Sequence, residues 1–378
     1  MADWSQLPKE LLQLISEKLN SEFYLTRFRS VCSTWRFSIL KPYNHFPLNL
    51  PHFFDSNNSV IHKLCKHNIF LIKPPSTPNQ QTPRPWLVRI SPTSTGKFNL
   101  WHPLLFHHRI PFSLLDFNHL SVFDLGHIYV EGMFYPNSST TVYQHYDRGV
   151  ATFQGGQILD IVAHKYIGQL MMFRCGDDDW TKLPNVAHFN QDICIFKGRP
   201  CVTYRTGRTL MIGSDLSVHL VAKPMLRADG CGTVSIIVEN ESELLLVHKY
   251  KDHYDRDDYD DDDYDDDDDD DDDDVHNDDE IVRIDVFRLD QKEKKRLKLA
   301  NLGDRVLFLG QGYSFIASAL DLGFDNGNFV IYCNDNFDAA SEMSIFHFDQ
   351  QRNSLFSDYP HYFKLVWPPP EWITSRCL

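Results

Sequence analysis

Residues 192–222 read DICIFKGRPCVTYRTGRTLMIGSDLSVHLVA, and the pattern of this segment indicates the fold of most of the chain. Runs of branched and aromatic residues alternate with short turns that contain glycine, which is typical of antiparallel strands joined by tight turns. The turns fall at Lys197-Gly198-Arg199, Thr206-Gly207 and Gly213-Ser214-Asp215. The four predicted strands cover residues 193–196, 201–204, 209–212 and 218–221. An antiparallel meander of four short strands has the size of one blade of a β-propeller.

The same four-strand unit recurs along the chain. After the first window, strands are predicted at 234–238, 244–248, 282–289 and 296–299, and then at 306–309, 313–317, 329–332 and 344–348. Upstream strands are predicted at 158–163, 170–174 and 180–183, and at 86–90, 98–101 and 122–130. At roughly 40–50 residues per blade, the region has room for about six four-stranded blades. The sequence therefore predicts a mainly β fold built as a propeller, with a β-sandwich or two stacked sheets as the alternative.

The first forty residues follow a different period, with apolar residues recurring every three or four positions. A first helix is predicted within residues 1–20, with Leu11, Ile15 and Leu19 on one stripe and Pro8 in its first turn. A second helix is predicted over 22–29, and Val31, Trp35 and Ile39 form the stripe of a third. Three short helices bury little surface on their own, so their apolar side needs a partner. Periodicity leaves open whether that partner is the following domain or another protein.

Between the helices and the strands lies a proline-rich stretch. Pro47, Pro51, Pro74, Pro75, Pro78, Pro83 and Pro85 argue against long regular elements there, although residues 68–73 are apolar enough for one strand. We therefore divide the chain into a helical module at 1–42, a linker at 43–67 and a β-domain at 68–373, with an acidic insertion at 252–280.

The helical module also resembles a known family. Its motif is Leu7-Pro8-x-Glu10-Leu11-Leu12-x-x-Ile15, then Leu19, then Arg29-x-Val31-Cys32-x-x-Trp35-Arg36, which looks like the F-box of plant proteins. The resemblance implies docking on the Skp-type adaptor of SCF ubiquitin ligases, and through it on a cullin and a RING subunit. By position it implies that the adaptor-facing or supporting residues are Leu7, Pro8, Leu11, Leu12, Ile15, Leu25, Val31, Cys32 and Trp35. Leu19 and Phe28 are alternative candidates for the internal core.

The β-domain resembles a second family over residues 60–373. The segments that carry the likeness are 86–90 (WLVRI), 302–310 (LGDRVLFLG), 358–360 (DYP) and 367–373 (WPPPEWI). They look like the KIB-type β-propeller of plant F-box proteins, whose members also place an F-box before the propeller.

The charge of the chain is unevenly distributed. The formal net charge is −15, but residues 252–280 alone contain 21 Asp+Glu and one Arg. The rest of the chain has 36 Lys+Arg against 31 Asp+Glu and is mildly basic. The acidic run lacks the glycine turn and terminal glutamate of a Ca²⁺-binding EF-hand loop, so we interpret it as a disordered, self-repelling loop. Alternatively, the acidic run is a surface that recruits basic proteins, or its charge is partly neutralised by the basic cluster Lys292, Lys294, Lys295 and Arg296. The basic cluster itself has two further interpretations, a nuclear-import signal and a basic hairpin turn.

The cysteine spacing and the hydropathy of the sequence indicate the class of protein. The eight cysteines have no C-x-x-C spacing, and the sequence has neither a signal-peptide pattern nor an apolar run of about 18–20 residues. We expect a soluble protein of the nucleus or cytoplasm with reduced thiols.

His62-x-x-Cys65-x-His67 lacks a fourth ligand for zinc, so no metal or cofactor is expected. No hydrolase, metalloprotease or phosphate-loop motif occurs, and no basic stripe indicates a nucleic-acid or membrane surface.

Two functions remain. The first is a non-catalytic substrate receptor of an SCF-type ubiquitin ligase, which recruits an unidentified target protein through its propeller. The alternative is a propeller outside any ligase whose acidic loop sequesters basic partners. The target itself does not follow from the fold.

Overall fold

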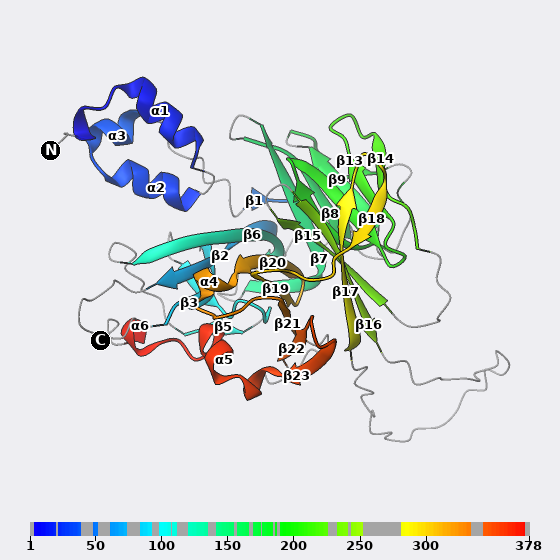
Figure 1. The fold of residues 1–378 in the computed structure, drawn as a ribbon. Coiled ribbons are helices and arrows are strands. Elements are labelled where there is room, and N and C mark those ends of the chain that lie inside the picture. The colour runs from blue at the N-terminus through cyan, green and yellow to red at the C-terminus, as the bar shows by residue number, and fades with distance from the viewer. Residues whose placement is uncertain are drawn as a thin grey trace, which may run out of the picture.

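A computed structural model of the chain shows a small helical module next to a large β-domain (Figure 1). It describes residues 4–19, 22–38, 48–51, 61–73, 84–92, 98–106, 108–111, 120–134, 141–154, 157–165, 169–174, 176–183, 186, 190–225, 233–240, 243–251, 281–333 and 343–374. No helix in these ranges is long and apolar enough to cross a membrane.

The N-terminal module contains a short 3-10 helix, Trp4–Gln6, and three α-helices: α1 (Lys9–Glu17), α2 (Glu22–Ser30) and α3 (Ser33–Ser38). The three predicted helices are therefore confirmed, although the first begins only after Pro8, whose extended backbone precedes the first turn. The predicted stripe of the third helix is partly wrong. Val31 lies before α3 and is 57% exposed, while Ile39 falls outside the described residues.

Residues 192–222 fold as predicted. They form an antiparallel meander of β11 (Asn190–Phe196), β12 (Arg199–Tyr204), β13 (Thr209–Ile212) and β14 (Val218–Ala222). Gly198 and Gly207 occupy turn positions with φ of 75° and 71°, where a side chain would strain the backbone. The next predicted unit is confirmed as well, as β15 (Thr233–Asn240), β16 (Glu243–Lys251), β17 (Ile281–Asp290) and β18 (Lys295–Lys298).

The C-terminal sheet has a less simple order, β20-β19-β21-β22-β23. Its strands are β19 (Arg305–Gly310), β20 (Tyr313–Ser318), β21 (Phe329–Cys333), β22 (Met343–His347) and β23 (Arg352–Leu355). β19 and β21 pair in parallel, because the intervening chain passes through β20 and the short helix α4 (Ala319–Leu322) before it returns. The four predicted strands are present, but a fifth strand is added and the pairing is not a meander.

The upstream strands form one sheet of ten strands instead of separate units. Its order is β10 (Thr181–Lys182), β9 (Gln169–Arg174), β8 (Gln157–Lys165), β7 (Thr141–Gln154), β6 (Ser121–Phe134), β2 (Ile61–Lys73), β3 (Trp86–Pro92), β4 (Phe98–Trp101) and β5 (Arg109–Ile110), with β1 (Leu48–Asn49) also paired to β2. The long β2 and β6 pair from Ile61↔Phe134 to Lys73↔Ser121 and so join two parts of the sheet. The first half of β2, with β1, lies in the stretch predicted as linker.

Neighbouring sheets contact one another through several strands, and one set of these contacts closes a ring. β7 contacts β11, β11 contacts β15, β15 contacts β20, and β20 contacts β6, which pairs with β7. This arrangement around a common centre is that of a propeller. The mainly β architecture with four-stranded sheets behind a helical module is thus confirmed, while the described residues form four sheets and not six separate blades.

The C-terminal helices pack against both the first strands of the β-domain and its C-terminal sheet. The helix α5 (Pro360–Val366), which follows the 3-10 helix η4 (Phe356–Asp358), buries Leu365 and Val366 in the core shared by β2, β3 and the C-terminal sheet. Ile373 of α6 (Glu371–Thr374) packs in the cluster that contains Trp86 of β3. The segment 367–373 therefore closes the β-domain against its first strands.

Candidate functional site

The first helix presents an apolar stripe to solvent. Leu11 and Leu14 are 46% and 57% exposed, and Ile15 lies beside them at the i+4 position. Leu12 points the other way and is fully buried. The spacing of three and four residues places the exposed side chains on one side of α1. An apolar stripe of this kind, on a helix this short, is characteristic of a surface that a partner covers.

More exposed apolar side chains lie around α3. Val31 precedes the helix, and Phe37 on it is 79% exposed. Trp35 packs its ring 4.5 Å from that of Phe28 and donates a hydrogen bond from Nε1 to the Trp4 carbonyl oxygen at 3.0 Å. Phe28 is buried. Trp35 therefore supports the module from inside while the side chains near it remain accessible.

The structure separates the nine predicted adaptor residues into three groups. Pro8, Leu11, Ile15 and Val31 are exposed; Leu7, Leu25, Cys32 and Trp35 are partly buried; and Leu12 is buried. Of the two residues proposed as internal core, Phe28 is buried and Leu19 is partly buried. Leu25 differs from the rest because it lines a cavity together with strands of the β-domain. The exposed residues Trp4, Leu14 and Phe37 were missing from the prediction, although the position of Leu14 three residues after Leu11 is a signal for it.

The second helix faces the β-domain. The Tyr24 hydroxyl donates to the Val122 carbonyl oxygen at 3.1 Å and accepts from the Asp124 N–H at 3.0 Å. Arg27 donates from Nη2 to the Leu120 carbonyl oxygen at 2.8 Å. The ring of Phe23 lies 5.1 Å from that of Phe70 on β2. Figure 1 shows α2 next to the sheets, with α1 and α3 on the far side of the module.

The contacts of α2 form at an unpaired edge of the sheet. β7 pairs with β6 only from Tyr129 to Phe134, and no other strand of the described residues pairs with the earlier part of β6 on that side. An unpaired strand edge exposes backbone N–H and C=O groups that need partners. Tyr24 and Arg27 supply these partners at residues 120–124. The helical module thus has two surfaces, one covered by the β-domain and one open to solvent.

The possible zinc motif does not assemble a site. His62 lies an odd number of residues from both Cys65 and His67 on β2, so it points to the opposite face of the strand. Burial raises the pKa of the Cys65 thiol to about 12 and lowers that of His67 well below its ordinary value. Within the described residues, no three His, Cys, Asp or Glu side chains gather as a metal site would require.

The acidic run at 252–280 lies outside the described residues, so its loop and recruiting interpretations stay predictions. The basic residues after it are described. Lys292 and Lys294 lie in the turn between β17 and β18, where Asp290 Oδ1 accepts from the Lys292 and Glu293 N–H groups at 2.9 and 3.1 Å. The prediction of a basic hairpin turn is confirmed.

Comparison with known proteins agrees with both parts of the chain. Residues 4–47 match the F-box domain, and residues 33–349 match the KIB1-4 beta-propeller. Among similar proteins of Arabidopsis thaliana, "F-box protein SKIP23" is 29% identical, covering 100% of this chain and 97% of that protein. "F-box protein At2g17036" is 27% identical, with 99% and 96% covered, and "Putative F-box protein At5g60060" is 28% identical, with 96% and 97% covered.

Both resemblances found in the sequence are thereby confirmed. The match to the propeller family includes most of the chain, and it begins inside the F-box match at α3. With the ring of sheets and the helical module in the order that these matches require, the chain belongs to the KIB1-4 beta-propeller family and carries an F-box domain at its N-terminus.

Proposed function

We propose that this protein is the substrate receptor of an SCF-type ubiquitin ligase, in which the open surface of the F-box binds the Skp-type adaptor and the propeller binds a target protein. In general, an F-box domain implies binding to a Skp1-type adaptor, and F-box proteins are non-catalytic subunits of SCF complexes.

One observation carries the proposal: one surface of the F-box is covered by the β-domain, and the other is exposed to solvent. The α2 surface is occupied by the edge of β6 through Tyr24 and Arg27. The α1 surface keeps Leu11, Leu14 and Ile15 exposed. A module that used its apolar side only to dock on its own β-domain would leave no such stripe, because burial of each leucine is worth about 1.5–3 kcal/mol. We assign the adaptor contact to this stripe, with Pro8 and Val31 beside it and Leu12 and Trp35 supporting it from within.

The arrangement also suggests how the receptor works. Through the adaptor it is tied to a cullin, and through the propeller to the target. The α2 contacts hold these two surfaces in one orientation, so that the target is presented to the ubiquitin-carrying subunit at a defined position. Such positioning accelerates a reaction without any catalytic group in the receptor. We place this activity in the nucleus or the cytoplasm.

The test is the affinity of the full-length protein for a purified Skp-type adaptor, measured by calorimetry. In the Leu11→Asp/Leu14→Asp variant we expect a loss of about 100-fold or more, because two apolar contacts of about 1.5 kcal/mol or more each are replaced by charges. Leu320→Asp on α4 is the matched control, because Leu320 is a comparable leucine, 78% exposed, on the β-domain. Unchanged affinity of the double variant, with intact circular dichroism, would refute the assignment.

A further inference from the structure

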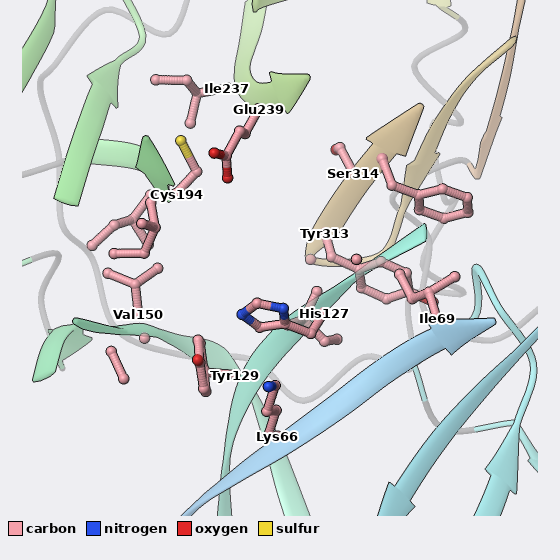
Figure 2. A pocket seen from close by; sticks show the side chains of 18 of the residues that line it. Lys66, Ile69, His127, Tyr129, Val150, Cys194, Ile237, Glu239, Tyr313 and Ser314 are labelled. Carbon is pink, nitrogen blue, oxygen red and sulfur yellow. The ribbon is translucent and has the colours of Figure 1, made fainter. Parts of the chain in front are cut away.

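The ring of inner strands lines an open cavity of about 550 Å³ at the centre of the propeller (Figure 2). Its wall comes from β2, β6, β7, β11, β15 and β20, which include all five strands of the ring. The F-box contributes Leu25 of α2. The volume lies in the range of small-molecule sites, which is about 300–1,000 Å³.

Most of the wall is apolar, and a few polar side chains reach into the space from separate strands. Ile128, Val150 and Ile237 represent the apolar part. Figure 2 shows Lys66 from β2, His127 from β6 and the carboxyl group of Glu239 from β15 around the cavity, with Lys66 and Glu239 on opposite sides of His127. An apolar enclosure with a few polar groups on different walls is the usual composition of a ligand site.

The two ends of the cavity differ in charge. Desolvation within the cavity, and to a lesser extent the nearby Lys66, lowers the pKa of the His127 imidazole to about 3, so the ring is neutral at pH 7. At the other end, partial burial raises the pKa of Glu239, although its carboxylate also accepts a backbone hydrogen bond from Lys197, which acts in the opposite direction. Asp192 also lines the wall, but its carboxylate is used by the fold: Oδ1 accepts from the Ile193 N–H and Oδ2 from the Ile237 N–H, each at 2.9 Å. Lys66 and Glu239 therefore define a basic and an acidic end.

We propose that the central cavity binds a small organic acid with an apolar body and a hydroxyl group at its far end. The ligand carboxylate lies at Lys66 and His127, the body packs on Ile128, Val150 and Ile237, and the hydroxyl donates to the carboxylate of Glu239. The site is distinct from the exposed surface of α1, so this inference does not depend on adaptor binding. Because Leu25 belongs to the wall, the occupied cavity also contacts the F-box helix.

The test uses three probes that share a 4-hydroxyphenyl group and differ at the other end: 3-(4-hydroxyphenyl)propanoic acid, tyramine and tyrosol. Binding to the full-length protein is measured by saturation-transfer NMR and calorimetry. We expect the acid to bind at least about tenfold more tightly than the amine or the alcohol, as one charge-assisted hydrogen bond requires. Absence of binding by the acid at millimolar concentration, or equal binding of the three probes, would overturn the proposal.

Substitutions of the cavity residues then test where the acid binds. Lys66→Met removes the preference for the acid. Lys63→Met is the matched control, because Lys63 lies three residues earlier on β2 and on its opposite face. Glu239→Gln weakens binding of the hydroxylated acid but not of 3-phenylpropanoic acid, which lacks the hydroxyl. Equal losses in Lys66→Met and Lys63→Met, or an acid preference that survives Lys66→Met in a folded protein, would place the probe elsewhere and contradict the inference.

Discussion

Replacing Tyr24 with phenylalanine tests how the F-box is held on the propeller. The substitution keeps the ring and removes only the hydroxyl, which makes two hydrogen bonds to β6, at 3.1 Å to the Val122 carbonyl oxygen and 3.0 Å to the Asp124 N–H. Each such bond contributes about 1 kcal/mol net, and the two backbone groups on the strand edge lose their partner. We expect the docked state to lose about 2 kcal/mol, or roughly 30-fold in the ratio of docked to undocked module.

This loss is large for a module with so small a core. In the described part of the F-box, Leu12 and Phe28 are the buried hydrophobic side chains. The helices therefore depend on the β-domain for much of their stability, since short helices are marginal when isolated. Local opening of α2 is expected to set its rate of amide exchange.

The assay is hydrogen–deuterium exchange of the full-length protein, followed by mass spectrometry of peptides from α2. In Tyr24→Phe the exchange of α2 amides should accelerate by roughly 30-fold, while peptides of β12 and β16 keep the rates of the unsubstituted protein. Tyr359→Phe is the matched control, because its hydroxyl pairs with His347 Nε2 at 3.0 Å and the Ser354 hydroxyl far from the F-box. Unchanged exchange of α2 in Tyr24→Phe would refute the inference that these bonds hold the module in place.

Three further predictions concern stability. Leu12→Ala should unfold the F-box and abolish adaptor binding without a change in the thermal transition of the β-domain, because removal of a fully buried leucine costs about 2–5 kcal/mol. Burial lowers the pKa of His102 from 6.5 to about 3, so its contribution to stability is complete above pH 6.5 and falls by roughly 1.4 kcal/mol per pH unit from there down to about pH 3. His102→Asn should flatten the acid limb of denaturant titrations over this range. Gly327→Ala should lower the melting temperature by several degrees in calorimetry, since the new Cβ would clash with the backbone carbon of Asp304. An unchanged transition would contradict that contact.

The sequence predicts those parts of the fold in which paired strands are neighbours along the chain. β11 to β14 follow from alternating apolar residues and glycine turns, and their partners are neighbours along the chain. The parallel pairing of β19 with β21 depends on a crossover that has no short-range signal. The prolines on either side of residues 61–67 argue against a long regular element, yet pairing with β6 makes these residues the first half of β2.

The same distinction holds for the candidate site. The stripe of α1 follows from helical spacing, which also locates Leu14. The docking of α2 could not be predicted, because Tyr24 and Arg27 bind backbone groups 93–100 residues away, at an edge that exists only when β6 continues beyond β7. Backbone partners leave no pattern in the sequence of either segment.

The most direct test of the account is to identify which surface of the F-box touches the adaptor. The photoreactive residue p-benzoylphenylalanine replaces either Leu14 on the exposed stripe or Phe23 on the surface that faces β2. Each full-length protein is then irradiated with the purified Skp-type adaptor, and the products are separated by mass. We predict an adduct with the adaptor from position 14 and none from position 23. An adduct from position 23 alone would contradict it, because the adaptor would then bind the surface that the propeller covers.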